Sequence, residues 1–366
     1  MTQRILITGG AGFIGSRLVN ALHASVPACR IWVFDNLHSQ VHGTEAKPPR
    51  LPEGMTFCLG DIRDKNAVSQ VVADAKPDLV YHLAAETGTG QSYDEISRYC
   101  DVNVSGTAYL IEALRAVKHP AQRVVLAASR AIYGEGGYQD ADGREHVGLP
   151  RDASAMLAGD FSVPMPAFAR LPVRPIPSHP GLPPAPASIY ASTKLMQEYL
   201  LRQACEGAPW KATLLRLQNV YGPGQSLRNP YTGVLSIFAQ QLLSGQSLSI
   251  YEDGEIARDF VYVDDVVSAL VAAGQASLPH GTTIDIGLGQ PTTILRTAKL
   301  LMQFLGCSER GLKVTGQFRV GDIRYAAADI SAARELLSWS PTVAIEEGLS
   351  RLAQWAIGEH AAIQPR

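Results

Sequence analysis

The sequence predicts an α/β protein built on a doubly wound parallel sheet of the Rossmann type, followed by a smaller mixed α/β domain. Short apolar runs alternate with segments of helical period through the first half of the chain, and a glycine-rich turn follows the first apolar run. Continuous apolar strands that alternate with helices indicate βαβ units. Right-handed crossovers then place these strands in a doubly wound sheet.

The elements of the first half follow in a regular order. Strands are expected at 5–7, 31–34, 79–83, 124–127 and 212–217, and helices at 13–24, 64–74, 101–117 and 190–204. The pattern is mixed after residue 218, with helices near 234–244, 264–275, 292–305 and 330–338. We therefore expect a Rossmann domain over 1–217 and a second domain mainly over 218–366, some segments of which return to pack on the first.

A proline-rich insert interrupts the Rossmann pattern at 138–187, which holds ten of the 23 prolines of the chain. It leaves the pattern just after the strand that ends near Ser129 and returns just before Tyr190. Long connections in compact domains are usually lids, binding loops or disordered segments. Because prolines reduce the freedom of the unfolded chain, we expect an ordered cover over the end of the site that these two residues mark.

Composition excludes several classes of partner. Hydrophobic residues make up 46% of the chain, charged residues 18%, and the formal net charge is −2 without any basic run, so neither nucleic acid nor an anionic membrane is expected to bind. We see no apolar stretch of ~20 residues and no signal-peptide pattern. The five cysteines lack metal-ligand or redox spacing, which favours free thiols in the cytoplasm and no metal site.

A cradle for a dinucleotide is predicted at the first strand-to-helix turn. The sequence TGGAGFIGS at 8–16 places Gly9, Gly12 and Gly15 where backbone amides and a helix N-terminus can approach a pyrophosphate. Asp35 ends the second strand, twenty residues past Gly15, where a carboxylate can accept hydrogen bonds from both ribose hydroxyls. It would repel a 2′-phosphate, so NAD is favoured over NADP. The alternative is a structural glycine turn with an incidental aspartate.

A further acidic residue, Asp61, follows the next apolar stretch and precedes Ile62. It could reach the adenine amino group, or it could cap the helix that begins at 64.

Tyr190 and Lys194 lie one helical turn apart, on one face of the predicted helix. A phenol with a pKa of about 10 is a poor base at neutral pH. A nearby ammonium and a bound nicotinamide cation would lower that pKa, and Lys194 could also hold the nicotinamide ribose. Ser129 lies just after the predicted strand 124–127, at the edge of the sheet where ligands bind in such folds, and could share a proton with Tyr190. The alternatives are an amphipathic helix with a surface lysine and a serine that caps a turn.

Taken together, these motifs resemble the extended short-chain dehydrogenases that act as NAD-dependent nucleotide-sugar epimerases and dehydratases. The resemblance runs from Ile5 to about Leu349. It is carried, besides the glycine turn, by DNL at 35–37, HLAA at 82–85, VNVSGT at 102–107, YASTK at 190–194, LRLQNVYGPGQ at 215–225, ARDFVYVDD at 257–265 and GDIRYAAAD at 321–329.

The resemblance implies roles for residues, and homodimers that pair through the helices near 101–117 and 190–204. Ser129, Tyr190 and Lys194 match the catalytic triad. The expected cofactor contacts are Gly9, Gly12, Phe13, Ile14, Gly15, Asp35, Asn36, Asp61, Ile62, Leu83, Ala84, Ala85, Asn103, Tyr190 and Lys194. The expected contacts to the nucleotide sugar are Thr87, Ser129, Arg130, Asn219, Arg258, Arg319 and Arg324.

Arginines suit a diphosphate because their planar fork binds phosphate oxygens in a bidentate way. Asn219, Arg258 and Arg319 fall where the family holds the diphosphate. Taken alone, Arg258 would be read as a surface ion pair with Asp259. Arg324 could be a further phosphate contact or a structural partner of Asp329.

The sequence departs from part of the family directly after Ser129. Family dehydratases carry an Asp-Glu pair there and decarboxylases a glutamate, whereas this chain has Arg130 and Ala131. Elimination and decarboxylation therefore lose their acid/base groups, and hydride chemistry at one carbon remains. The stretch 85–92, the insert and the segment 229–233 look most like bacterial dTDP-L-rhamnose 4-epimerases.

The expected activity is thus a 4-epimerase that passes through a 4-keto sugar with tightly held NAD. Three alternatives stay open: a UDP-hexose 4-epimerase, a reductase of nucleotide 4-ketosugars that consumes NADH or NADPH, and a non-enzymatic NAD-sensing regulator on the same fold.

Overall fold

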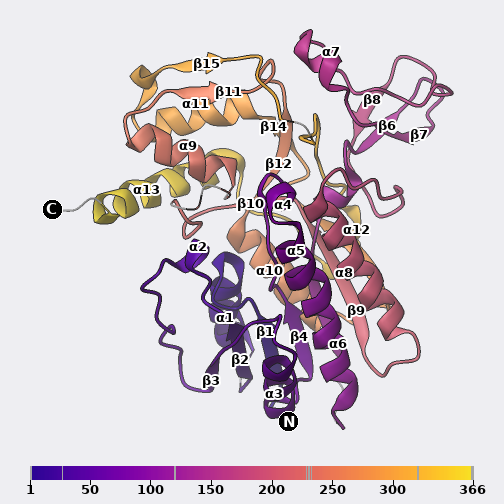
Figure 1. The fold of residues 1–366 in the computed structure, drawn as a ribbon, viewed down its shortest axis with the longest axis vertical. Coiled ribbons are helices and arrows are strands. Elements are labelled where there is room, and N and C mark those ends of the chain that lie inside the picture. Colours follow the sequence, from indigo (N-terminus) through magenta and orange to yellow (C-terminus); the bar gives the residue numbers. More distant parts are fainter. Residues whose placement is uncertain are drawn as a thin grey trace.

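A seven-stranded parallel sheet forms the centre of the computed structural model, which describes residues 2–26, 28–118, 121–227, 229, 231, 233–319 and 321–363. The strand order is β13-β9-β5-β4-β1-β2-β3, and all neighbours are parallel (Figure 1). The strands are β1 (Arg4–Thr8), β2 (Arg30–Asp35), β3 (Met55–Leu59), β4 (Leu79–His82), β5 (Arg123–Ser129), β9 (Lys211–Leu217) and β13 (Thr282–Ile286). The chain winds outward from β1 in both directions, so the predicted doubly wound sheet is confirmed.

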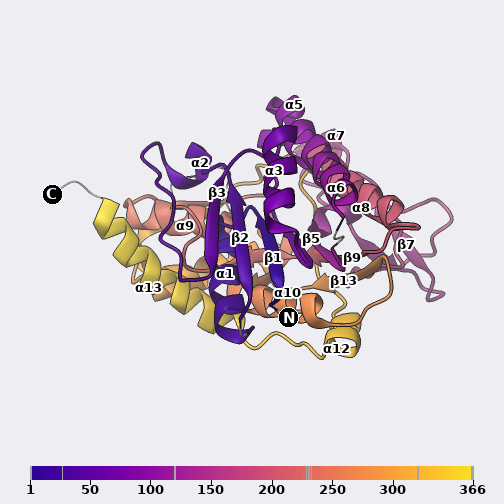
Figure 2. The same cartoon turned by 90° about the horizontal axis from the view of Figure 1, so that it is seen from below.

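Helices cover both faces of this sheet, as Figure 2 shows. One face packs on α1 (Phe13–Ser25), α10 (Val263–Gln275) and α12 (Ser331–Leu337), the other on α3 (Lys65–Ala75), α6 (Gly106–Ala116) and α8 (Ile189–Cys205). Strand side chains alternate between the faces, so Ile5 and Ile7 join the first core while Leu6 joins the second. Apolar runs bounded by helices fold this way because both faces of each strand are buried.

Two strands of the sheet have no counterpart among the five predicted. β3 precedes the turn at Asp61, and β13 comes from the second half of the chain and pairs with β9. The run TTIDI of β13 contains polar residues, which hid it from a search for apolar strands. The helices α10 and α12, on either side of β13 in the sequence, also pack on the large sheet.

A smaller part of the molecule lies beyond the carboxyl ends of the strands. It holds a mixed sheet of β10 (Asn219–Tyr221), β12 (Ala257–Tyr262) and β14 (Pro291–Thr293), and a parallel pair of β11 (Leu248–Ile250) and β15 (Leu312–Val314). Its helices are α9 (Val234–Leu243), α11 (Ile294–Phe304) and α13 (Ile345–Ile363). The sequence predicted α9 and α11 but missed α13, although Glu346 and Glu347 in its first turn favour a helix start.

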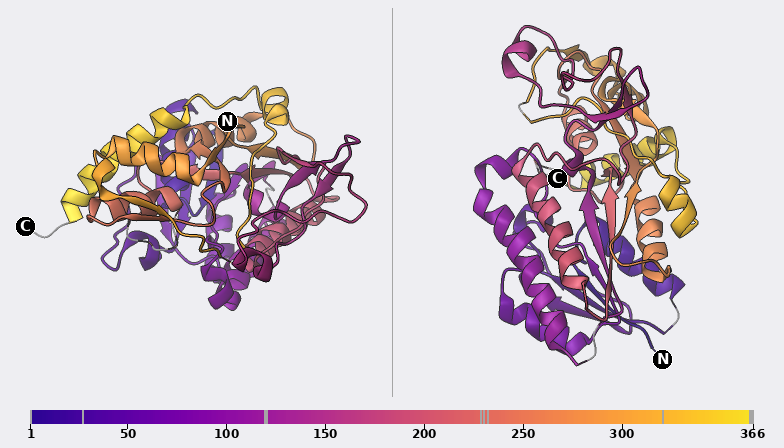
Figure 3. Two further views of the ribbon diagram at one scale, coloured as in Figure 1. Left: turned by 90° about the horizontal axis from the view of Figure 1, so that it is seen from above. Right: turned by 90° about the vertical axis from the view of Figure 1, so that its right-hand side faces the viewer.

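The proline-rich insert is folded. It forms an antiparallel sheet of β6 (Gly137–Gln139), β7 (Glu145–Val147) and β8 (Arg174–Ile176) and carries α7 (Ala153–Leu157). The end of the insert is fixed near the large sheet, where the Ala185 N–H donates to the Ile132 carbonyl at 2.8 Å. Figure 3 shows the insert at the same end of the molecule as the smaller part. That it covers a bound sugar remains a prediction.

A buried arginine joins the insert to the smaller part. Arg151 donates from Nε to Glu135 and from Nη1 to Glu252, both at 2.8 Å, and from Nη2 to the carbonyl of Asp322, also at 2.8 Å. Its side chain and that of Glu252 are almost wholly buried. The three bonds use each of the three nitrogens of one guanidinium, which suits arginine rather than lysine.

Removal of this arginine should destabilise the protein strongly. Arg151→Met leaves Glu135 and Glu252 buried with one cation fewer, and loss of one partner of a buried ion pair lowers the free energy of unfolding by about 3–5 kcal/mol. Chemical denaturation measures this value. Arg144→Met in the same insert is the control, because its side chain is 69% exposed and lies 3.6 Å from Asp142, so its stability should stay near that of the unaltered protein. Equal effects of the two substitutions would contradict the structural role of Arg151.

Candidate active site

The glycine turn after β1 has the close backbone approach that a dinucleotide cradle requires. Gly9 has φ +70°, and a Cβ there would lie 2.6 Å from the Ala84 nitrogen. A Cβ on Gly15 would lie 2.3 Å from the Gly9 carbonyl oxygen. Helix α1 begins at Phe13 behind the cap residue Gly12, which has no side chain to bond the first amides. The amides near Phe13 and Ile14 are therefore open to an anionic ligand.

Asp35 ties the end of β2 to this turn. Its carboxylate accepts from the Ala11 N–H at 3.0 Å and from the Leu37 N–H at 2.9 Å, and the side chain is 8% exposed. Each oxygen thus takes one backbone bond and keeps a second lone pair, which is the capacity needed for two ribose hydroxyls.

Asp61 is part of a polar group at the adenosine end of the predicted site. It accepts from Asn36 at 2.9 Å and from the Arg63 guanidinium at 2.7 and 3.0 Å, which holds the pKa of its carboxyl well below the usual range. The alternative that Asp61 caps α3 is wrong, because Asp64 accepts from the first amides of that helix. Ile62 is buried and packs beneath α6.

A fully buried histidine, which the sequence reasoning missed, links the turn to the helices. His82 ends β4 and is hydrogen-bonded through Nδ1 with the Thr8 hydroxyl at 2.7 Å and through Nε2 with the Thr107 hydroxyl at 2.9 Å. Gln197 of α8 donates to the same Thr107 hydroxyl at 2.8 Å. Burial, with the nearby charge of Lys194, lowers the pKa of His82 to about 3, so the ring is neutral.

The segment Leu83, Ala84 and Ala85 follows directly and is fixed at the edge of β1. The Leu83 N–H donates to the Thr8 carbonyl at 3.0 Å and the Ala84 N–H to the Thr8 hydroxyl at 3.3 Å. Their backbone thereby lies against Gly9, as contacts to a cofactor would require. Thr87, further along, is exposed, and its carbonyl accepts from Tyr99.

Asn103 holds two parts of the site in place. It lies in a π-helical turn over Cys100–Ser105 that leads into α6, and it is fully buried. Its Oδ1 accepts from the Glu86 N–H at 2.8 Å, and its Nδ2 donates to the Glu86 carbonyl at 3.1 Å and to the Thr193 hydroxyl at 2.9 Å. The amide thus bonds protein groups at both ends and fixes α8 next to Lys194.

Ser129 and Tyr190 meet where β5 ends and α8 begins. Ser188 caps α8, so its first turn points Tyr190 at the strand end, where the phenol is hydrogen-bonded with Ser129. Ser129 also accepts from the Ala131 N–H at 3.1 Å, so it is both a turn cap and a partner of the phenol. Burial raises the pKa of Tyr190, against the Ser129 hydrogen bond and the positive charge of Arg130. The expected lowering of this pKa is thus absent without a cofactor.

Lys194 is buried on the same helix, with 3% of its surface exposed. Glu198, one turn on, is fully engaged by Arg216, which donates to both carboxylate oxygens at 2.9 and 2.7 Å. Among the described residues the Lys194 amine has no ion-pair or hydrogen-bond partner. Burial lowers its pKa to about 7, with Glu198 acting in the opposite sense. An amine of this kind fits the nicotinamide ribose of the cofactor, while the glycine cradle fits its pyrophosphate and Asp35 its adenosine ribose.

The arginines predicted for the diphosphate differ in their surroundings. Arg258 is 7% exposed and donates to Asp322 at 2.5 Å, so its reading as a surface ion pair with Asp259 is wrong. Asp259 instead accepts from three backbone N–H groups, those of residues 288, 289 and 328. Arg319 is exposed and lies over the Tyr251 ring at 5.1 Å.

Arg324 is engaged by two carboxylates. It donates to Glu252 at 2.9 Å and to both oxygens of Asp253 at 2.7 Å, so its pairing with Asp329 is wrong, and a phosphate would have to compete with these acids. Asn219, at the start of β10, has no side-chain hydrogen bond to the described part of the chain. In the segment 229–233, residues 230 and 232 lie outside the described residues.

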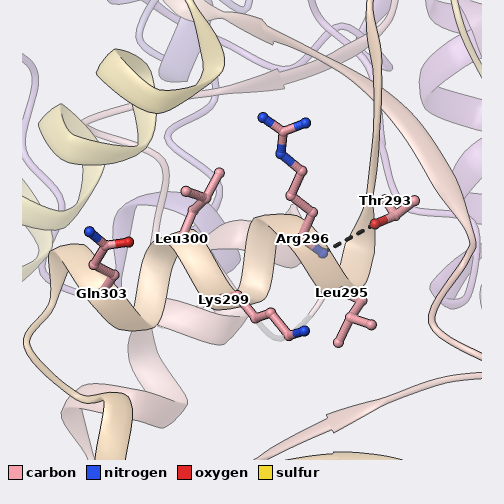
Figure 4. A pocket seen from close by; sticks show the side chains of 6 residues that line it. All are labelled: Thr293, Leu295, Arg296, Lys299, Leu300 and Gln303. Carbon is pink, nitrogen blue, oxygen red and sulfur yellow. Dashed lines mark hydrogen bonds between the residues drawn. The ribbon is translucent and has the colours of Figure 1, made fainter.

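A shallow pocket on α11 lies apart from these strand ends (Figure 4). It is lined by Thr293, Leu295, Arg296, Lys299, Leu300 and Gln303. Arg296 already donates to Glu346 at 2.8 Å, and none of the lining residues belongs to the large sheet. Within the described residues, no three acidic, histidine or cysteine side chains gather as metal ligands. No described helix has the length and apolarity that crossing a membrane requires.

Comparison with known proteins agrees with this geometry. The model of the NAD dependent epimerase/dehydratase family matches residues 5–151 and 170–287. A dTDP-L-rhamnose 4-epimerase of Burkholderia thailandensis is 40% identical over 98% of this chain and 96% of its own. A UDP-glucose 4-epimerase of Mycolicibacterium smegmatis is 30% identical over 96% of this chain and 98% of its own.

Solved structures of the same kind superpose over nearly the whole length. The UDP-glucose 4-epimerase of Thermotoga maritima, solved with UDP-glucose, has a TM-score of 0.77 at 30% identity, covering 97% of this chain and 99% of that one. The UDP-glucose 4-epimerase of Thermus thermophilus, solved with NAD, has a TM-score of 0.77 at 27% identity and the same coverage. With its cradle, its Tyr190–Lys194 helix and these relatives, the chain belongs to the NAD-dependent epimerase/dehydratase family and is an enzyme that uses NAD.

Proposed function

We propose that this enzyme is a 4-epimerase of nucleotide sugars and that its substrate is dTDP-L-rhamnose, which it interconverts with dTDP-6-deoxy-L-talose. The observation that carries the proposal is the meeting of Ser129, Tyr190 and the buried Lys194 at the carboxyl end of the sheet. The relative from Burkholderia thailandensis supports the choice of sugar, and the 30% identical UDP-glucose 4-epimerases make UDP-glucose the second candidate.

The reaction needs a base, a proton relay and a hydride acceptor. Bound NAD supplies the acceptor, which takes a hydride from the sugar carbon and later returns it. Tyr190 removes the hydroxyl proton, and the Ser129 hydroxyl donates to the same sugar oxygen. Lys194 binds the ribose and places a positive charge near the phenolate, so the phenol ionises more easily once the cofactor is present. Inversion requires that the keto sugar turn over, which a firmly held diphosphate and a loosely held hexose allow.

The surroundings of the triad favour epimerisation over elimination. Arg130 and Ala131 occupy the positions directly after Ser129, so no carboxylate follows it there. The closest following acid in the sequence, Glu135, is engaged by Arg151 and by the Arg324 N–H. A second acid/base pair for proton transfer at neighbouring carbons is therefore absent from this turn, and one-carbon redox chemistry remains.

We assign the binding of the diphosphate to Arg258, Arg319 and Asn219. We also propose that the outer faces of α5, α6 and α8 form the contact of a homodimer. Ile96 of α5 (Ile96–Tyr99) and Met196 of α8 are 50% and 43% exposed, as apolar residues of an unpaired face would be. The five cysteines are free, which fits a cytoplasmic enzyme.

Tyr190→Phe should leave the fold and NAD binding intact while turnover falls by roughly 10³-fold or more, because general-base catalysis typically contributes 10²–10⁴-fold. Conversion of dTDP-L-rhamnose, followed by chromatography or NMR, measures the change. Tyr199→Phe is the control, since that ring is exposed on the same helix and should keep full activity. A Tyr190→Phe enzyme that keeps most of its activity would remove Tyr190 as the base.

Asp35→Asn should weaken NAD binding about tenfold, because the ribose hydroxyls lose a hydrogen bond to a charged group, which is worth about 1.5 kcal/mol. The asparagine still offers an acceptor for the Ala11 N–H. Discrimination against NADP should shrink, since the repulsion of the 2′-phosphate is gone. Calorimetry on cofactor-free protein measures both affinities. Asp74→Asn is the control, because the Asp74 carboxylate is exposed and accepts a hydrogen bond from Gln70. Equal affinity of the unaltered enzyme for NAD and NADP would count against the role of Asp35.

Substrate labelled with deuterium at C4 should give product that still carries deuterium at C4, without added cofactor. The label returns because the enzyme delivers the same hydride to the opposite face. Mass spectrometry and NMR locate the label, and absorbance at 340 nm reports net cofactor use. Stoichiometric oxidation of added NADH or NADPH would instead establish a reductase.

A further inference from the structure

Arg130 is a buried cation that the protein leaves partly unpaired. It is the first residue of a 3₁₀ turn over Arg130–Tyr133, directly after Ser129, and only 8% of it is exposed. Its Nη2 donates to the Gly134 carbonyl at 3.0 Å, but its Nε has no hydrogen-bond partner within the described residues. No described carboxylate lies within ion-pair distance of it. Such a group is costly to bury unless a ligand completes its bonds.

The acidic groups whose charge reaches Arg130 are already engaged. Glu135 pairs with Arg151, Asp322 with Arg258, and Asp259 with three backbone amides. Asp285 accepts through Oδ2 from Tyr133 at 2.8 Å, while its buried Oδ1 has no hydrogen-bond partner among the described residues. Burial raises the pKa of Asp285 to about 7, so near neutrality it carries only part of a charge. Burial and the positive charge of Arg258 lower the pKa of Arg130 to about 10, which still leaves it protonated at pH 7.

A second buried group beside this turn also lacks partners. Ser129 of β5 is in register with Leu217 of β9, so Arg130 and Gln218 are the next residues beyond two neighbouring strand ends. Gln218 is 4% exposed, and neither its Nε2 nor its Oε1 is hydrogen-bonded to the described residues. Two neighbouring strand ends, one of them directly after Ser129, thus carry buried polar atoms that have no hydrogen-bond partner among the described residues.

The same turn lies close to the reacting groups. The positive charge of Arg130 acts on the Tyr190 phenol, which is itself hydrogen-bonded with Ser129. The Tyr99 ring packs edge-on against Tyr190 at 6.4 Å, and Lys194 lies one turn further along α8. Arg130 is therefore a cation close to the phenol as well as to Ser129.

We propose that Arg130 is a catalytic residue of the epimerisation, in which its guanidinium donates a hydrogen bond to the sugar oxygen that Tyr190 deprotonates. This inference rests on the proposed function. The hydroxyl O–H bond breaks and its proton passes to Tyr190, the C–H bond breaks with its electron pair leaving to bound NAD, and a C=O bond forms. The oxygen carries negative charge while these events are incomplete, and a fixed cation next to it stabilises that charge.

This role explains why an arginine stands where an acid would support elimination. A carboxylate at this position would repel the developing oxyanion, whereas a guanidinium attracts it and also favours the phenolate form of Tyr190. The neighbouring residue, Ala131, adds no further acid or base.

The test compares the unaltered enzyme with Arg130→Met and Arg130→Lys. The pH dependence of kcat is measured with dTDP-L-rhamnose, and calorimetry gives the affinity for dTDP-L-rhamnose and for dTDP alone. Arg123→Met is the matched control, because Arg123 lies at the opposite end of the same strand and donates to Thr213 at 2.8 Å. Melting temperature and bound NAD report whether each variant folds.

Arg130→Met should lower kcat by about 10²-fold or more, the effect of removing one donor from an oxyanion site. The rise of kcat with pH should move upward by about one pH unit, because the phenolate loses a nearby cation. Affinity for dTDP should stay unchanged while affinity for the sugar nucleotide falls, and Arg130→Lys should recover part of the rate.

Three results would overturn the inference: an unchanged pH profile with nearly full kcat in Arg130→Met, an equal loss of dTDP affinity, or the same losses in Arg123→Met. Failure of the unaltered enzyme to convert dTDP-L-rhamnose or UDP-glucose would contradict the proposed function instead. In that case the calorimetry still decides on Arg130, since an unchanged ratio of sugar-nucleotide to dTDP affinity would exclude a contact with the sugar.

Discussion

The buried hydrogen bonds of His82 connect the two ends of the site, and the geometry of the rest depends on them. Thr8 comes from the end of β1, Thr107 from α6 and Gln197 from α8, so one neutral imidazole fixes a strand and two helices relative to one another. The cradle begins at Gly9, directly after Thr8, and α8 carries Tyr190 and Lys194. Both ring nitrogens of His82 are hydrogen-bonded, so another orientation of the ring would leave a buried polar atom unpaired, and this fixes the groups that depend on it.

The electrostatics of the site follow from what surrounds this network. Lys194 and Arg130 are both buried, and neither has an ion-pair partner among the described residues, whereas Glu198 pairs with Arg216 and Asp259 accepts from backbone amides. Two such cations destabilise the ligand-free protein. A nucleotide sugar and a dinucleotide bring many oxygen acceptors, and their binding relieves this unfavourable burial. The same charges then act on the phenol and on the sugar oxygen, so binding and catalysis draw on one arrangement.

Local patterns allowed the sequence to predict the glycine cradle, Asp35 and the Tyr190–Lys194 helix, since each depends on spacing within one βα unit. The partners of buried polar groups were not predictable in this way. His82 meets Thr8 across 74 residues, Arg324 meets Asp253 across 71, and β13 joins the sheet after a crossover through α10. No strand was predicted within the insert, because its strands are three residues long and too short to show a period.

The bonds of Arg151 have a mechanical consequence. The insert begins and ends on the large sheet, yet its arginine bonds Glu252, a residue of the smaller part that follows β11. The insert therefore connects the part that contains the large sheet to the smaller part. Any hinge motion that separates them must either carry the insert along or break the two hydrogen bonds from Arg151 to Glu252 and to the carbonyl of Asp322. Relative motion of the two parts is therefore restricted for as long as these hydrogen bonds hold.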